Sequence, residues 1–154
     1  MSPSATDSPI AVLNRFYEAE RRYMAAGGKA GGASFDEFAS TMADDVVLHQ
    51  TPDLPWGGEY LGVERYADWA AQMSDCFETV DVQDAKFIES DDQVIVLCTL
   101  ETKAKRTGEV IRHPMVQVIT VKDGKITDFR PFYWHVPDYV SAEKGLKTSF
   151  SKQL

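Results

Sequence analysis

The fold is decided by residues 115–136, which read MVQVITVKDGKITDFRPFYWHV. Two apolar runs flank the turn KDGK at residues 122–125, and an Asp-Gly pair between apolar runs is the strongest short-range signal for a β-hairpin. The second run ends in FYWH at residues 132–135, a group of aromatic rings followed by a histidine. Aromatic rings with a few polar groups are typical of small-ligand sites. The stretch therefore predicts a hairpin whose far end lines a cavity.

Other strands precede this hairpin, and two runs are apolar at consecutive positions instead of alternate ones. These runs are VIVLC at residues 94–98 and MVQVI at residues 115–119. Consecutive apolar positions indicate a strand that is buried on both faces. Helices can cover one face of the sheet, so we expect a second copy of the chain to cover the other, in a homodimer packed sheet to sheet. The predicted strands span residues 46–51, 82–89, 93–105, 109–121 and 125–136.

Three helices are predicted before the main run of strands. The first spans residues 9–26, where Ser8 can cap the N-terminus and the next residue is a proline suited to the first turn. Its apolar face includes one acidic residue, Glu20. The second and third helices are predicted at residues 34–42 and 63–79 from caps and from apolar positions three or four residues apart.

Two tryptophans have open interpretations at this stage. Trp56 lies in TPDLPWGG at residues 51–58, a turn-rich loop, where it can form a cavity wall or plug the loop onto the core. Trp69 lies on the apolar face of the third helix beside Met73, where plain packing and pocket lining are both consistent with the spacing.

Length and composition indicate one domain. A chain of 154 residues can bury roughly 68–70% of its unfolded surface in a single core. We expect a flexible tail at residues 1–8, the domain at residues 9–140, and a C-terminal tail at residues 141–154. The two cysteines, Cys76 and Cys98, lie within apolar patterns and are predicted to be buried thiols, which suits a reducing compartment.

Charge and hydropathy exclude several classes of partner. The formal net charge is -8, from 24 acidic and 16 basic residues, which argues against nucleic acid and anionic membranes. No apolar run reaches the ~18 residues that span a bilayer. The N-terminal residues show no basic start followed by an apolar core, so no secretion signal is predicted and the cytoplasm is the expected location.

Three groups of residues resemble those of a known superfamily. They are ADDVV at 43–47, PWGG at 55–58 with Tyr60 and Gly62, and DGKI at 123–126 followed by RPFYW at 130–134. Together they resemble the nuclear transport factor 2-like superfamily, and within it the SnoaL-like polyketide cyclase and ketosteroid isomerase-like branch. The resemblance covers about residues 10–140. It implies an α+β cone fold, in which a strongly bent antiparallel (mixed) sheet and three N-terminal helices enclose a pocket.

The resemblance also locates the pocket, among the first and third helices, the first strand and the last two strands. Members of the superfamily include isomerases, cyclases, epoxide hydrolases and dehydratases, so the fold does not determine the reaction. The residues that the resemblance implies as pocket lining are Phe16, Tyr17, Leu48, Gln50, Trp56, Trp69, Met73, Gln117 and Tyr133.

The catalytic groups of relatives are replaced at the matching positions. The two aspartates of ketosteroid isomerase correspond to Gln50 and Gln117, and an amide cannot take up a proton, which argues against that mechanism. The Arg–Asp pair of the epoxide hydrolases corresponds to Glu101 and Lys103, which alternation with apolar residues predicts to point outward. In cyclase-like relatives an aspartate follows the Tyr-Trp of the last strand. His135 stands there instead and is the predicted catalytic acid or base.

The other two histidines, His49 and His113, are less strongly indicated as pocket residues. His49 adjoins Gln50, so alternation points one of them inward; the resemblance favours Gln50, and a kink at Pro52 would reverse this. His113 precedes a proline and is predicted to be structural or near the rim. No metal site is predicted, because no His-x-His or Cys-x-x-Cys spacing is present.

Two functions follow from these residues. The first is a cofactor-free enzyme that cyclises, isomerises or dehydrates a small, largely apolar carbonyl compound, with Tyr133 or Gln50 donating a hydrogen bond to the enolate oxygen. The second is a non-catalytic homodimer that binds a small apolar ligand. A dimeric scaffold without a pocket is the third alternative. The first two differ in whether His135 faces open volume and has an orienting partner.

Overall fold

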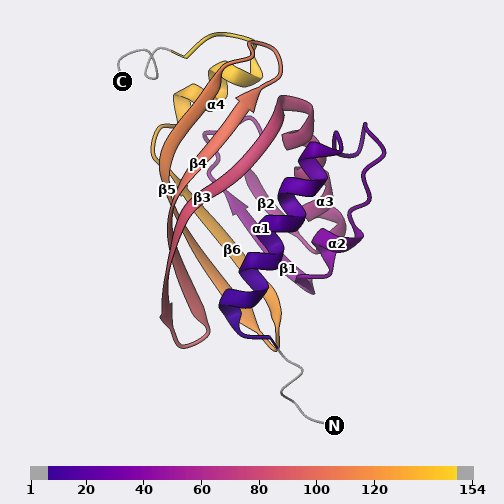
Figure 1. Ribbon diagram of the computed structural model, residues 1–154, viewed down its shortest axis with the longest axis vertical. Helices are drawn as coiled ribbons and strands as arrows, with labels where there is room; N and C mark the ends of the chain where they lie inside the picture. Colours follow the sequence, from indigo (N-terminus) through magenta and orange to yellow (C-terminus); the bar gives the residue numbers. More distant parts are fainter. Residues whose placement is uncertain (1–6, 149–154) are drawn as a thin grey trace.

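The computed structural model describes residues 7–148, and within them the chain forms four helices and one six-stranded sheet. The strand order is β2-β1-β6-β5-β4-β3, and β1 runs parallel to β6 whereas the other neighbours are antiparallel. The sheet stays open, and the expected α+β cone fold is confirmed (Figure 1). The elements are α1 Pro9–Ala25, α2 Asp36–Ala39, β1 Met42–Gln50, β2 Gly58–Leu61, α3 Val63–Cys76, β3 Phe77–Ser90, β4 Gln93–Ala104, β5 Val110–Lys122, β6 Lys125–Tyr133 and α4 Val136–Glu143.

The three predicted helices form with shorter ends, and α4 was not among them. The Ser8 hydroxyl caps α1 by accepting a hydrogen bond from the Ala11 amide at 3.2 Å. Helix α3 ends at Cys76, three residues earlier than predicted, because the next residue already has extended backbone angles and begins β3. None of the helices in residues 7–148 is long and apolar enough to cross a membrane. The outer parts of both predicted tails, residues 1–6 and 149–154, lie outside the described residues.

The hairpin of β5 and β6 forms as predicted from its turn. Asp123 and Gly124 both have positive φ, of 51° and 75°, which a two-residue hairpin turn of the favoured hand requires. Strand β2 was not predicted: its first residue, Gly58, ends the predicted turn-rich loop at residues 51–58, and residues 59–61 were not assigned to any element. It pairs with the end of β1, from Val47–Leu61 to Gln50–Gly58.

The parallel pairing of β1 and β6 ends early. Its last register pair is Leu48 with Phe129, although β1 continues to Gln50 and β6 continues to Tyr133. The two strands therefore diverge at their C-terminal ends. A register shift in β3 between Gln83 and Lys86 interrupts a second ladder, and such bulges bend a strand.

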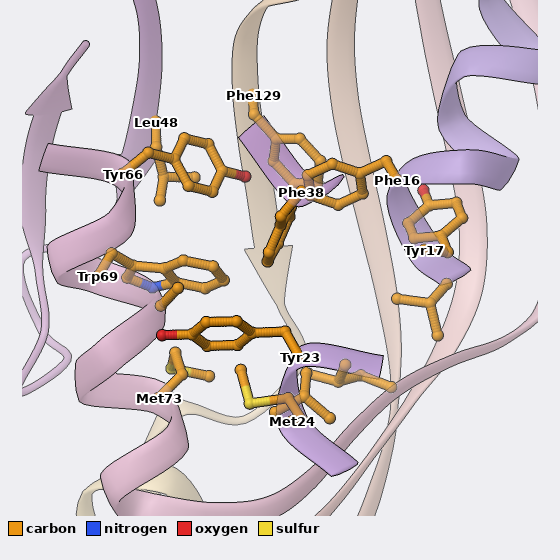
Figure 2. Packing of buried hydrophobic residues seen from close by; sticks show 14 of the residues in the cluster. Phe16, Tyr17, Tyr23, Met24, Phe38, Leu48, Tyr66, Trp69, Met73 and Phe129 are labelled. Carbon is orange, nitrogen blue, oxygen red and sulfur yellow. The ribbon is translucent and has the colours of Figure 1, made fainter. Parts of the chain in front are cut away.

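The core lies between the helices and one face of the sheet. Helix α1 crosses the sheet and contacts β3, β5 and β6, while α3 lies against β1 and β2 (Figure 1). The Phe16 ring packs against those of Phe38 and Phe129, with centroids 4.9 and 5.2 Å apart (Figure 2).

Cys76 and Cys98 are both buried as free thiols, as predicted, and burial raises the pKa of each to about 11.

The opposite face of the sheet keeps large apolar side chains in contact with solvent. Along β4, Val94 and Val96 are buried under the helices, whereas Leu97 is 38% exposed. The strand register places Leu97 beside Val116 of β5, and Val116 beside Phe132 of β6, which is 54% exposed. The runs that are apolar at consecutive positions thus supply residues to both faces of the sheet.

Candidate functional site

A small cavity lies between the helices and the inner face of the sheet. Its volume is about 30 Å³. A cavity needs at least roughly 10–15 Å³ to hold one water molecule, so this one has room for about two. A larger ligand therefore requires the walls to move. Its lining residues are Phe16, Glu20, Leu48, Gln50, Tyr66, Trp69, Met73, Val80, Val82, Leu100, Met115, Gln117, Phe129, Pro131 and Tyr133.

Glu20 is the acidic group of this cavity. It lies on the inner face of α1 and is only 5% exposed. Burial raises the pKa of its carboxyl to about 8; Asp81 adds to the rise, and Arg21 opposes it. These two charges also pair with each other, with 3.4 Å between Arg21 Nη1 and Asp81 Oδ1. At neutral pH the Glu20 carboxyl is therefore mainly protonated and can donate a hydrogen bond.

Two hydrogen-bond donors in the cavity wall have no partner among the described residues. They are the hydroxyl of Tyr66 and Nε1 of Trp69, which are both buried on α3. Figure 2 shows the Tyr66 hydroxyl projecting from α3 toward Phe129. A buried donor without a partner costs roughly 1–3 kcal/mol. These donors and the Glu20 carboxyl join Gln50, Gln117 and Tyr133 as the polar residues of a largely apolar lining, which suits the oxygen of a small ligand.

The two glutamines of the lining are each held by a tyrosine. The Tyr17 hydroxyl donates to Gln117 Oε1 at 2.6 Å, and the Tyr133 hydroxyl donates to Gln50 Oε1 at 2.9 Å. Burial raises the pKa of both phenols, and the nearby Glu20 raises them further, so both remain protonated donors. These bonds orient the amides, which cannot themselves take up a proton.

The structure brings most of the predicted pocket residues together. Seven of them line the cavity, and Tyr17 reaches it through its bond to Gln117. Trp56 lies apart from that lining: it is buried against Phe77, with ring centroids 5.7 Å apart, and borders a separate shallow cleft. The seven lining residues are Phe16, Leu48, Gln50, Trp69, Met73, Gln117 and Tyr133.

Gln50 lines the inner cavity, and His49 lies on the other side of β1. The His49 ring nitrogens lie 2.8 Å from Glu59 Oε2 and 2.8 Å from Asp128 Oδ2. Strand alternation therefore continues to the end of β1, and the kink at Pro52 does not reverse it.

His135 lies beyond β6, outside the described cavity lining. It is the N-cap residue of α4, its side chain is 31% exposed, and its Nε2 is 3.9 Å from Asp138 Oδ1. Asp138 Oδ2 also contacts Nε2 of the buried His113 at 2.7 Å. Strand β6 ends at Tyr133, so the alternation that would direct His135 into the cavity stops two residues before it. Within residues 7–148, no group of three or more His, Cys, Asp or Glu side chains could hold a metal ion.

The sequence analysis did not assign two polar residues of the site, Tyr66 and Glu20, and only Glu20 had a signal of its own. Its one signal was a lone acid within the apolar face of α1, which is unusual because an acid on a buried face loses its hydration. That signal marks a candidate but does not show whether the acid is paired, exposed at the helix edge or enclosed in a cavity.

A second, larger cleft opens beside the cavity. Its volume is about 570 Å³, and it lies where β1 and β6 diverge. Gln50, Pro131 and Tyr133 line both the cleft and the cavity. The two spaces are therefore separated by a shared wall of three side chains.

Comparisons with known proteins agree with this fold. A family profile described as "SnoaL-like domain" matches residues 15–129. TerC co-crystallised with polyporic acid is 22% identical, with a TM-score of 0.71, and the match covers 92% of this chain and 99% of that chain. A protein of ketosteroid isomerase-like fold from Catenulispora acidiphila, in complex with trimethylamine, is 18% identical, with a TM-score of 0.68 and coverage of 91% and 95%.

A third similar structure is a candidate polyketide cyclase from Xanthomonas campestris. It is 18% identical, with a TM-score of 0.68, and the match covers 87% of this chain and 95% of that chain. Identities this low show a common fold and do not carry over an activity. The sequence matches none of the curated proteins compared with it.

Proposed function

The chain belongs to the SnoaL-like family, and from this premise we propose that it binds a small, largely apolar carbonyl compound in the central cavity and exchanges a proton with it through Glu20. The observation that carries the proposal is an enclosed carboxyl group that shares an apolar cavity with two buried donors lacking partners. Support for a small ligand comes from two similar structures, which hold polyporic acid and trimethylamine.

The chemistry follows from the three polar groups. The Tyr66 hydroxyl donates a hydrogen bond to the carbonyl oxygen and stabilises the charge that develops there as an enolate forms, and Trp69 Nε1 offers a second buried donor in the same lining. The ionised Glu20 carboxylate removes the proton from the neighbouring carbon, and the resulting acid returns it to carbon or oxygen. Such proton transfer needs no cofactor. In isomerisation the proton returns to a different carbon. In cyclisation the enolate carbon bonds to a second carbonyl carbon, whose oxygen takes the proton. In dehydration the enolate expels a hydroxyl group from the next carbon, which leaves with the proton as water.

Glu20 is better placed than His135 for this role. A catalytic acid or base works best when its pKa lies near the working pH, and the Glu20 carboxyl meets this condition through burial. It also lines the cavity, whereas His135 caps α4 and contacts Asp138. The role first predicted for His135 stays a prediction.

We also propose that the protein is a homodimer. Leu97, Val116 and Phe132 form an aligned apolar row across three neighbouring strands, on the sheet face opposite the helices. A second copy packed on this row would remove it from water, and each square ångström of apolar surface so buried stabilises by roughly 25 cal/mol. Exposed apolar patches of this kind typically mark association surfaces.

Hydrogen–deuterium exchange tests the proposed proton transfer without knowledge of the natural substrate. Cyclopentanone and indan-1-one are compact ketones whose α-protons exchange in D₂O, which NMR follows directly. We expect the protein to accelerate exchange and Glu20→Gln to lower the rate roughly 100-fold or more, because the amide keeps the shape but not the base. His135→Asn should stay within about threefold of the parent rate, given its distance from the lining.

Glu18→Gln is the matched control, because Glu18 lies on the same helix, is exposed and pairs with Arg22. It should leave the exchange rate unchanged. An unchanged rate in Glu20→Gln would contradict the role of this residue. Saturable binding of both ketones without any accelerated exchange would favour the non-catalytic ligand-binding dimer instead.

A further inference from the structure

The outer cleft has the size of a ligand site, whereas the central cavity does not. Ligand pockets commonly enclose ~300–1,000 Å³. The cleft encloses about 570 Å³, and the cavity encloses about 30 Å³. A compound that reaches Glu20 and is larger than a few atoms must therefore extend into additional space. The cleft is adjacent to the cavity and shares three wall residues with it.

The wall between the two spaces is a side-chain contact and not a strand ladder. The register of β1 and β6 ends at Leu48–Phe129. From this pair onward, side-chain contacts join the strands: the Tyr133 hydroxyl donates to Gln50 Oε1 at 2.9 Å on the cavity side, and His49 Nε2 lies 2.8 Å from Asp128 Oδ2 on the other side of β1. Side-chain rotation can break one hydrogen bond without disrupting the sheet, since no backbone bond is lost. The Gln50 and Tyr133 side chains thus form a partition between the cleft and the cavity that can open without loss of sheet structure.

The cleft also carries an unpaired positive charge. Arg130 is exposed in its wall, and no carboxylate of the described residues lies within ion-pair distance of its guanidinium. The acidic groups nearest the cleft are already engaged, because Glu59 and Asp128 both contact His49 at 2.8 Å. Guanidinium groups bind carboxylates through two parallel hydrogen bonds. The cleft wall thus holds one guanidinium without a carboxylate partner and one carboxylate, Glu59, that contacts His49, so Arg130 is the place where an anion would bind.

We propose that the outer cleft is a second part of the ligand site, in which Arg130 binds the carboxylate of an elongated apolar ligand whose other end passes between Gln50 and Tyr133 into the central cavity. An apolar chain can contact one part of the remaining wall, which consists of Pro52, Pro131, Phe132 and Val136, whereas His49, Thr51 and Glu59 form its polar part. The inference rests on the proposed function in taking the central cavity as the reactive end. The substrate class is then a carbonyl compound that carries a carboxylate at the end remote from the carbonyl group.

The cleft lies at the margin of the proposed dimer surface. Phe132 belongs both to the cleft wall and to the apolar row across β4, β5 and β6. The cleft extends from there toward β1 and β2, where Thr51 and Glu59 line it. A second copy on the apolar row would therefore border the cleft at one side, and the binding experiment uses the protein in its native oligomeric state.

Octanoate and octan-1-ol form a matched pair of probes, because they share a chain length and differ in the charged end. Calorimetry should show that Arg130→Gln weakens octanoate binding roughly tenfold and leaves octan-1-ol binding unchanged. The control is Arg112→Gln, on the neighbouring β5 and paired with Glu101 away from the cleft, which should change neither affinity. Equal effects of Arg130→Gln on the two probes would overturn the proposal, and so would an absence of octanoate binding to the parent protein.

The partition is tested by kinetics. Tyr133→Phe removes the hydrogen bond to Gln50 and keeps the ring, so stopped-flow fluorescence should show faster association of both probes. An unchanged association rate would show that ligands do not enter between these residues. Neither probe needs proton transfer for binding, so these results are independent of the exchange experiment. Loss of exchange without an effect at Arg130, or the reverse, identifies which of the two proposals fails.

Discussion

Replacing Glu20 by glutamine should stabilise the protein, and the gain should grow with pH. The Glu20 carboxyl has a folded-state pKa of about 8, against its ordinary value of 4.5, because burial disfavours the charged form. Below pH 4.5 the acid is neutral in both the folded and unfolded chains. Between the two values the unfolded chain has lost the proton while the folded chain retains it. Stability therefore falls as pH rises through this window and stays low above it.

The magnitude follows from the distance between the two pKa values. About 3.5 pH units at 1.36 kcal/mol each correspond to a cost on the order of 5 kcal/mol above pH 8. Glutamine does not titrate, so the free energy of unfolding of Glu20→Gln lacks this cost. Between pH 5.5 and pH 9, its stability advantage over the parent should increase by on the order of 3 kcal/mol.

Urea unfolding of both proteins across this pH range measures the effect. Every other titrating group is common to the two chains, so the difference in unfolding free energy isolates Glu20. Glu18→Gln serves again as the exposed control on α1. A flat difference for Glu20→Gln, or one that decreases with rising pH, would show that the Glu20 carboxyl does not lie in a desolvated cavity, and would refute the reasoning.

Two further predictions concern the dimer and the cavity wall. Light scattering at micromolar concentration should give twice the 17.2 kDa chain mass for the parent protein. Leu97→Glu places a charge in the exposed apolar row and should give the mass of one chain. A monomeric parent would contradict the proposed homodimer. Binding of indan-1-one should change the intrinsic tryptophan fluorescence of the parent and of Trp56→Phe but not that of Trp69→Phe, because only Trp69 of these two lines the central cavity; a response that persists without Trp69 would place the ligand elsewhere.

Local chemistry determined the elements that could be predicted. The Asp123-Gly124 turn, the Ser8 cap and the apolar spacing of α1 and α3 each act within a few residues, so they can be interpreted without knowledge of the fold. The motifs that resemble a known superfamily then supplied the cone fold and seven of the fifteen residues that line the cavity. Strand β2 lacked such a signal, because four residues beside two glycines form a strand only when the end of β1 offers backbone partners.

Tertiary structure decided the chemistry of the site. In sequence, Glu20 is one acid in an amphipathic helix. Burial raises the pKa of its carboxyl to about 8, in a cavity that it shares with Val80, Val82 and Leu100 from two strands far along the chain. The histidine chosen from the sequence depended on alternation along β6, which stops when the chain turns into α4. Residue types and their spacing are visible in the sequence itself. Desolvation is a sum over distant neighbours, and only the folded chain specifies those neighbours.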